Sequence, residues 1–385
     1  MQQNRQFLYV VWLLATLTSC IKPYTPDIRL DDQIKYVVNG QINDSDVIQT
    51  INISKTSPID DPAYIPAEGC SVIVQAETGE SFDFFYNGNG DYQGHIPSAF
   101  LIPGKAFKLE IITSEGDNIT SDFDRMSEGP SLGDVYWEVD TLFGNQIGDQ
   151  TTGIQFYVDL EAEPQHSRYY RWESIETWEY HADYPLQWYY DGSVHRVEPP
   201  DYSRKICWNT QNVPYVFSIN TNNLSDNRFL KFPLHFVSSR TSRLAFGYSV
   251  NIKQYTLSDE AYRYWEQMRL NNEQDAGLFE KQPVPVRGNL HYSSGDKEVL
   301  GFFGVSSMRS KRLFIFDNGG VTLDFSTFCN PSALERQGLK EIRPYEYPAY
   351  LMGDEETYYL VVLNEECVNC LALGGVNVKP DFWPR

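Results

Sequence analysis

The sequence predicts an all-β protein of two successive domains, because short β-branched and aromatic stretches alternate with turn signals along most of the chain. Residues 47–54 and 70–76 place apolar side chains at about every second position, which is the period of a half-buried strand. The Asn-Gly-Asn-Gly-Asp run at residues 87–91 is a strong hairpin turn signal. The spacing of the strands predicts an immunoglobulin-like sandwich over residues 33–125, followed by a larger antiparallel β domain over residues 130–385.

One helix is expected inside the second domain. Ser258 can act as its N-cap, and Asp259 and Glu260 place negative charge in the first turn. Aromatic and apolar residues then recur at near-helical spacing, beginning with Tyr262 and Trp265. The pattern predicts a helix near residues 258–272.

The first 19 residues have the layout of a bacterial lipoprotein signal peptide. A polar start with one cation precedes an apolar run over residues 7–17, which is too short for the ~20 residues that span a bilayer. The run ends in Leu-Thr-Ser-Cys, which resembles a lipobox, so Cys20 is expected to carry lipid and residues 20–32 to form a tether. The alternative is ordinary secretory cleavage beside an incidental cysteine.

Composition excludes some functions and supports folding into packed cores. Lys and Arg number 31 against 52 Asp and Glu, giving a net charge of −21, and nucleic-acid binding needs the opposite sign. The sequence contains no nucleophile elbow, zinc-protease motif or phosphate-binding loop. We therefore expect no catalytic residue, metal ion or cofactor, although a pair of glycosidase carboxylates remains possible among so many acids.

The cysteines predict structural cross-links in an oxidising compartment. The Cys-x-x-Cys pair near the C-terminus lacks the further ligands of a zinc site and the strand-to-helix context of a redox site. We expect Cys70 to be a buried free thiol. Two disulfide bonds are expected among four cysteines, with the pairing left open: Cys207, Cys329, Cys367 and Cys370.

Aromatic residues are densest over residues 169–190, where they favour either a sandwich core or a contact surface for a ligand or partner. Four of them are the candidates for such contacts. Trp172 and Trp178 share one face of a regular strand, so we expect these two to belong to the core. Trp188 and Tyr189 have turn residues on both sides and are expected on an exposed loop tip.

Ten short segments occur in an order that is similar to a known family. They are residues 36–40, 53–58, 69–72, 90–107, 261–265, 277–279, 282–283, 288–289, 300–303 and 374–383. Together they resemble the Bacteroidota lipoproteins catalogued as domain of unknown function 4249. Cys70 departs from the small residue that is more usual there.

This resemblance implies an outer-membrane lipoprotein, often encoded beside a TonB-dependent, SusC-like transporter. It also implies a transthyretin-like or carboxypeptidase-regulatory-like N-terminal sandwich, and it supplies no catalytic residue. The first acid after the lipid cysteine is Asp27, later than is typical of surface export, yet the cell surface is favoured over the periplasm. The leading expectation is a non-enzymatic accessory or ligand-capture subunit of the transporter. The alternatives are a surface hydrolase acting on glycans or esters, and a structural or adhesive envelope protein.

Overall fold

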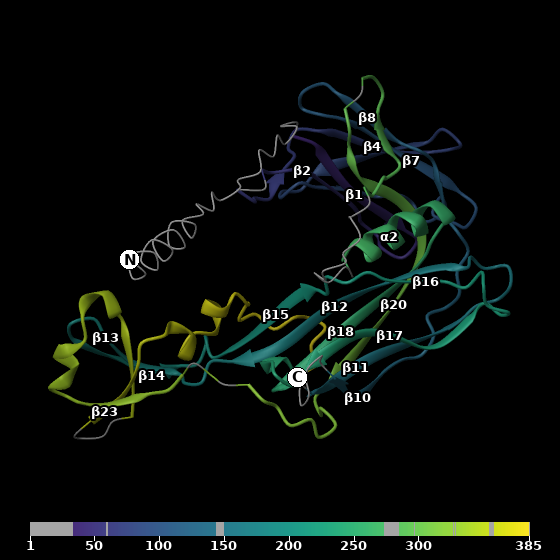
Figure 1. Cartoon of the computed structure of the whole chain (residues 1–385). Coiled ribbons are helices and arrows are strands. Elements are labelled where there is room, and N and C mark those ends of the chain that lie inside the picture. Colours follow the sequence, from purple (N-terminus) through teal and green to yellow (C-terminus); the bar gives the residue numbers. More distant parts are fainter. Residues whose placement is uncertain are drawn as a thin grey trace, which may run out of the picture. The chain divides into compact units, whose positions relative to one another are not determined.

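The computed structural model describes residues 34–58, 61–143, 150–272, 285–295, 297–325, 327, 329–353 and 358–384, and about half of these lie in strands (Figure 1). This confirms the all-β fold class. The helix α2 (Asp259–Asn272) occupies the expected position, and the Ser258 hydroxyl caps it by accepting the Ala261 N–H at 3.1 Å. None of the helices in the described ranges is long and apolar enough to span a membrane. The expected signal peptide, Cys20 and the tether at residues 20–32 lie outside the described residues.

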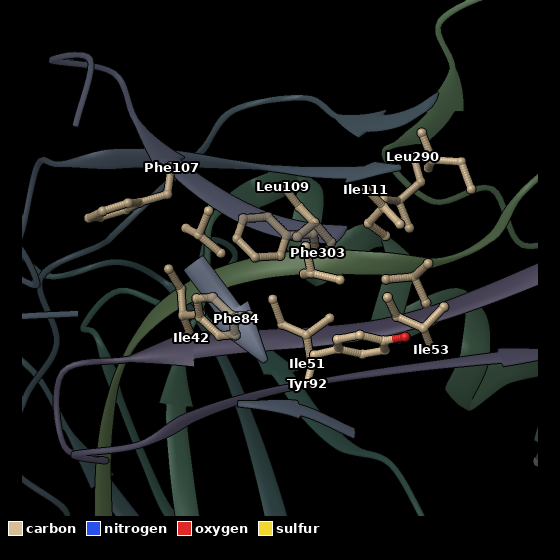
Figure 2. Close-up of a cluster of buried hydrophobic side chains, with 14 of the residues drawn as sticks. Ile42, Ile51, Ile53, Phe84, Tyr92, Phe107, Leu109, Ile111, Leu290 and Phe303 are labelled. Carbon is tan, nitrogen blue, oxygen red and sulfur yellow. The ribbon is translucent and has the colours of Figure 1, made fainter. Parts of the chain in front are cut away.

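Most of the N-terminal strands contribute side chains to one hydrophobic core (Figure 2). Ile51 and Ile53 of β2, Tyr92 of β6 and Phe107 of β7 are completely buried there. The strands are β1 (Tyr36–Asn43), β2 (Gln49–Lys55), β3 (Ile65–Pro66), β4 (Ser71–Ala76), β5 (Ser81–Tyr86), β6 (Asp91–Gly94), β7 (Ala106–Ile112), β8 (Asn118–Ser121) and β9 (Asp124–Arg125).

Two later strands complete this core. β19 (Leu290–Tyr292) pairs with β8, and the first part of β20 (Leu300–Ile315) pairs in parallel with β1, from Val37 opposite Leu300 onwards. Leu290 and Phe303 therefore point into the same core as the N-terminal strands (Figure 2). The second part of β20 pairs antiparallel with β18 (Gly247–Thr256), so one long strand runs from the first core to the second.

The second core lies between two sheets of the middle region. One sheet contains β15-β12-β18-β20 and the other contains β10-β11-β17. Trp172 of the first sheet stacks on Phe232 of the second, with ring centroids 4.6 Å apart. The additional strands of this region are β10 (Val135–Phe143), β11 (Gln150–Glu161), β12 (Tyr169–His181), β15 (Ile206–Asn212), β16 (Phe217–Asn220) and β17 (Arg228–Ser238).

A smaller sheet has the strand order β14-β13-β22-β23-β21 and carries hydrophobic clusters on both faces. Its strands are β13 (Leu186–Tyr190), β14 (Val194–Asp201), β21 (Ser332–Glu335), β22 (Ala349–Met352) and β23 (Tyr358–Val362). The short 3-10 turns among the residues that the structure describes are η1 (Ser242–Leu244), η2 (Gly338–Glu341), η3 (Pro344–Glu346), η4 (Glu365–Cys367) and η5 (Cys370–Leu373).

The two expected disulfides are present, and their pairing is now defined. Cys207 bonds to Cys370 and Cys329 bonds to Cys367, so neighbouring cysteines of the Cys-x-x-Cys motif have separate distant partners. The motif is therefore a double cross-link rather than a redox pair. The expectation of a free Cys70 is confirmed, but the side chain is only half-buried against the first core.

Candidate functional site

The aromatic candidates of the middle strand belong to the core. Trp172 is 0% exposed and donates its indole N–H to the amide oxygen of Gln254 at 3.0 Å. Trp178, on the same face of β12, is 9% exposed and packs in the same core. The structure thus confirms the core position that strand periodicity predicts for both residues.

The expected loop tip at Trp188 and Tyr189 is wrong. Both residues lie in strand β13, are half-buried, and pair with β14 on one side and β22 on the other. The turn that follows Asp191 connects β13 to β14, as the local signal indicates. The strand itself was hidden because its second neighbour, β22, lies about 160 residues later, beyond the reach of any local pattern.

The pairing of β13 with β14 is irregular between Leu186 and Trp188, where β14 has extra residues between Arg196 and Asp201. Leu186 and Tyr189 share one face of the sheet, where Tyr350 packs against them. Trp188 points to the other face, where its ring meets Tyr359 edge-on at 6.4 Å between centroids. Tyr189, one of the four sequence candidates, lines an open pocket.

This pocket, called the tyrosine pocket below, has a volume of about 390 Å³. Its lining comes from Leu186, Tyr189, Asp191, Arg204, Tyr347, Pro348 and Tyr350. In the strand register Tyr189 lies directly between His195 of β14 and Tyr350 of β22. The His195 ring stacks on Tyr189 with centroids 4.7 Å apart and planes 15° from parallel, which fixes the orientation of the tyrosine ring.

The polar groups of the pocket carry opposite charges. The carboxylate of Asp191 contacts His195 Nε2 at 2.8 Å, and this hydrogen bond lowers the pKa of Asp191. Arg204 is exposed and forms no salt bridge within the described ranges. Burial, followed by the charges of Glu365 and Glu366, raises the pKa of Tyr350 to about 12, so its phenol keeps its proton at neutral pH.

Ser193, His195 and Asp191 lie together at the β13–β14 turn, but their geometry is not that of a catalytic triad. The Ser193 hydroxyl is 3.0 Å from His195 Nε2, and Asp191 Oδ1 is 2.8 Å from the same nitrogen. A triad needs the carboxylate on one ring nitrogen and the nucleophile on the other, because the carboxylate must hold the tautomer that accepts the serine proton. Here both groups compete for one nitrogen. Sequence analysis missed this cluster, which follows the Asp-Gly turn signal.

A second cluster that sequence analysis missed surrounds Glu176 in the second core, where the side chain is 1% exposed. One carboxylate oxygen accepts from Arg243 at 2.8 Å and Gln211 at 2.6 Å. The other accepts from the Tyr248 hydroxyl at 2.8 Å and lies 3.2 Å from His235 Nε2. Burial would raise the pKa of Glu176, but the hydrogen bonds from His235, Gln211 and Tyr248 lower it to about 2.

The Glu176 cluster links the two sheets of the second core rather than lining the tyrosine pocket. Glu176 belongs to β12 and His235 to β17, in the opposite sheet. Strand alternation places Glu176 on the same face as Trp172 and Trp178, and that alternation was the signal that could have revealed it. Within the described part of the chain, no three or more His, Cys, Asp or Glu side chains are placed to share a metal ion.

Comparison with known proteins identifies the family. No curated protein matches the chain. A family model described as Domain of unknown function (DUF4249) matches residues 21–312. The matched range contains Tyr189, Asp191 and Arg204 of the tyrosine pocket, whereas Tyr347 and Tyr350 come after it. Since the match covers well over half of the sequence, the chain belongs to the DUF4249 family.

Proposed function

We propose that this chain is an outer-membrane lipoprotein that captures a ligand for a TonB-dependent transporter and catalyses no reaction itself. The lipobox-like sequence at Cys20 and the resemblance to envelope lipoproteins support the location, with the cell surface favoured over the periplasm. The tyrosine pocket is the observation that carries the binding role.

The form of the pocket suits binding. Its volume of about 390 Å³ falls within the ~300–1,000 Å³ of typical small-ligand sites. Tyrosine combines a large apolar ring with a polar hydroxyl and loses little conformational entropy when it makes a contact. Tyr189 is held by a strand on each side and by the His195 ring, so the pocket is largely formed before a ligand arrives.

Hydrolysis is the second candidate, because Ser193, His195 and Asp191 are the residue types of a hydrolytic triad. The shared ring nitrogen argues against it, since His195 cannot accept the serine proton through Nε2 while that nitrogen donates to Asp191. Binding therefore ranks above hydrolysis.

The test of the proposal uses the full chain expressed in its native envelope. Solubilisation in mild detergent and affinity purification should recover a TonB-dependent transporter in an amount comparable to the chain. The variant Cys20→Ala should leave the membrane fraction and lose the transporter. Recovery of the wild-type chain from native membranes without such a transporter, even after chemical cross-linking, would refute the accessory role.

A further inference from the structure

We propose that the tyrosine pocket binds the rings of a neutral saccharide. This inference rests on the proposed function, because it names the class of ligand that is captured.

The aromatic walls point to a ring-shaped ligand with apolar faces. Tyr189 and Tyr347 are half-buried, and each keeps part of its surface open to the pocket beside Pro348 and Leu186. Sugar rings present flat arrays of C–H groups that pack on aromatic rings, and their hydroxyls remain free to form hydrogen bonds. Rings fixed by their neighbours favour this packing because little entropy is lost on binding.

The position of the pocket argues against an extended peptide as the ligand. Peptides commonly bind sheets by adding a strand to a free edge, where main-chain groups are available. Tyr189 lies on a central strand whose main-chain groups face β14 on one side and β22 on the other. Recognition at this pocket must therefore use side chains, and these offer ring surfaces and a few polar groups.

The polar groups match sugar hydroxyls, which both donate and accept hydrogen bonds. Asp191 offers carboxylate oxygens as acceptors, and Arg204 offers guanidinium N–H groups that no carboxylate within the described ranges occupies. Tyr347 already donates its hydroxyl to the Ile342 carbonyl at 3.2 Å, but its oxygen can still accept. Donors and acceptors thus both reach the aromatic surface.

Charge favours a neutral saccharide over an acidic one. The chain has a net charge of −21, which opposes the approach of a polyanion. Within the pocket, the cation of Arg204 is offset by the carboxylate of Asp191, which His195 keeps ionised. A uronic acid polymer would place further carboxylates beside Asp191.

Isothermal titration calorimetry of the intact purified chain tests this class directly. The probes are hexasaccharides of glucose, xylose and mannose with different linkages, an oligogalacturonate, and a tyrosine-containing tripeptide. We expect at least one neutral hexasaccharide to bind with a dissociation constant in the millimolar range or below. Binding of the oligogalacturonate or the tripeptide alone, or of no probe at millimolar concentration, would overturn the inference.

Single substitutions then locate the site on the protein. Tyr189→Ala should weaken binding by about tenfold or more, and Tyr189→Phe, which keeps the ring, by less than about threefold. Arg204→Gln is a second test because it replaces an exposed side chain and leaves the packing intact. The matched controls are Arg196→Gln and Trp188→Phe on the opposite face of the sheet, which should leave binding unchanged.

The variants also separate this inference from the proposed function. Equal losses in Arg204→Gln and Arg196→Gln would place the site elsewhere and overturn the saccharide pocket. Transporter recovery without saccharide binding would overturn the ligand class alone, whereas saccharide binding without a transporter would overturn the accessory role alone.

Discussion

The substitution Glu176→Gln tests the polar link between the two sheets of the second core. The side chain keeps its volume but loses its negative charge, and one carboxylate oxygen becomes an amide nitrogen. An amide nitrogen cannot accept a hydrogen bond. In one orientation of the new amide, Arg243 and Gln211 lose their acceptor, and in the other orientation Tyr248 loses its acceptor. The variant therefore leaves buried donors without an acceptor.

The expected loss can be worked out in two ways. Removing one partner from a buried charge network typically costs ~3–5 kcal/mol. A folded-state pKa of about 2 against the ordinary 4.5 corresponds to about 3 kcal/mol, at 1.36 kcal/mol per pKa unit. Both estimates are a large share of the ~5–15 kcal/mol that holds a domain folded.

The assay is urea unfolding of both proteins between pH 2 and pH 7. Because the folded-state pKa is depressed, the contribution of Glu176 is complete above about pH 4.5 and is lost as the pH falls toward 2. The difference in unfolding free energy between wild type and Glu176→Gln should therefore become smaller as the pH falls from 4.5 toward 2. The control substitution is Glu138→Gln, which removes an exposed salt bridge with Lys231 and should lower the unfolding free energy by less than ~1 kcal/mol. A loss below ~1 kcal/mol for Glu176→Gln at pH 7 would refute the reasoning.

Three further outcomes are expected from unfolding measurements. Burial raises the pKa of Asp124 to about 6, so the free energy of unfolding of wild type should fall as pH rises from 4 to 6. Asp124→Asn should remove up to about 3 kcal/mol of this pH-dependent loss, and parallel pH profiles of wild type and variant would contradict the reasoning. Replacing Cys207 and Cys370 by serine should cost ~2–5 kcal/mol of unfolding free energy. This cost should exceed that of removing the Cys329–Cys367 disulfide by about 1 kcal/mol, because the Cys207–Cys370 bond closes the longer loop. A larger cost for the Cys329–Cys367 disulfide would contradict this explanation. Trp172→Ala should cost ~3–5 kcal/mol and half-buried Trp188→Ala less, and equal melting temperatures would be inconsistent with their burial.

Features that depend on neighbouring residues could be predicted from the sequence. Ser258 and the acids after it signal the start of α2, and the hydroxyl forms the expected cap. Alternation also placed Trp172 and Trp178 in the core. The capping hydrogen bond lies within one helical turn, and the alternation of side chains lies within one strand. A local sequence pattern is therefore enough to predict both features.

Long-range pairing could not be predicted in the same way. The two parts of β20 pair with β1 and β18, and β1 lies more than 250 residues before β20 in the sequence, whereas β18 lies fewer than 50 residues before it. The disulfide pairing has the same character, because three pairings of four cysteines are equally compatible with their spacing. Only the folded chain distinguishes among them.

The tyrosine pocket combines both kinds of information. Aromatic density over residues 169–190 marks the segment, but the same residue types form a core at Trp172 and a pocket wall at Tyr189. Alternation along β13 decides which of its rings share a face, and β22 supplies Tyr350 from far along the chain. Ordinary alternation puts Tyr189 and Trp188 on opposite faces of β13, but it does not say which face has a pocket. That depends on Tyr350 and on Tyr347 and Pro348 before it, which only the folded chain brings beside Tyr189.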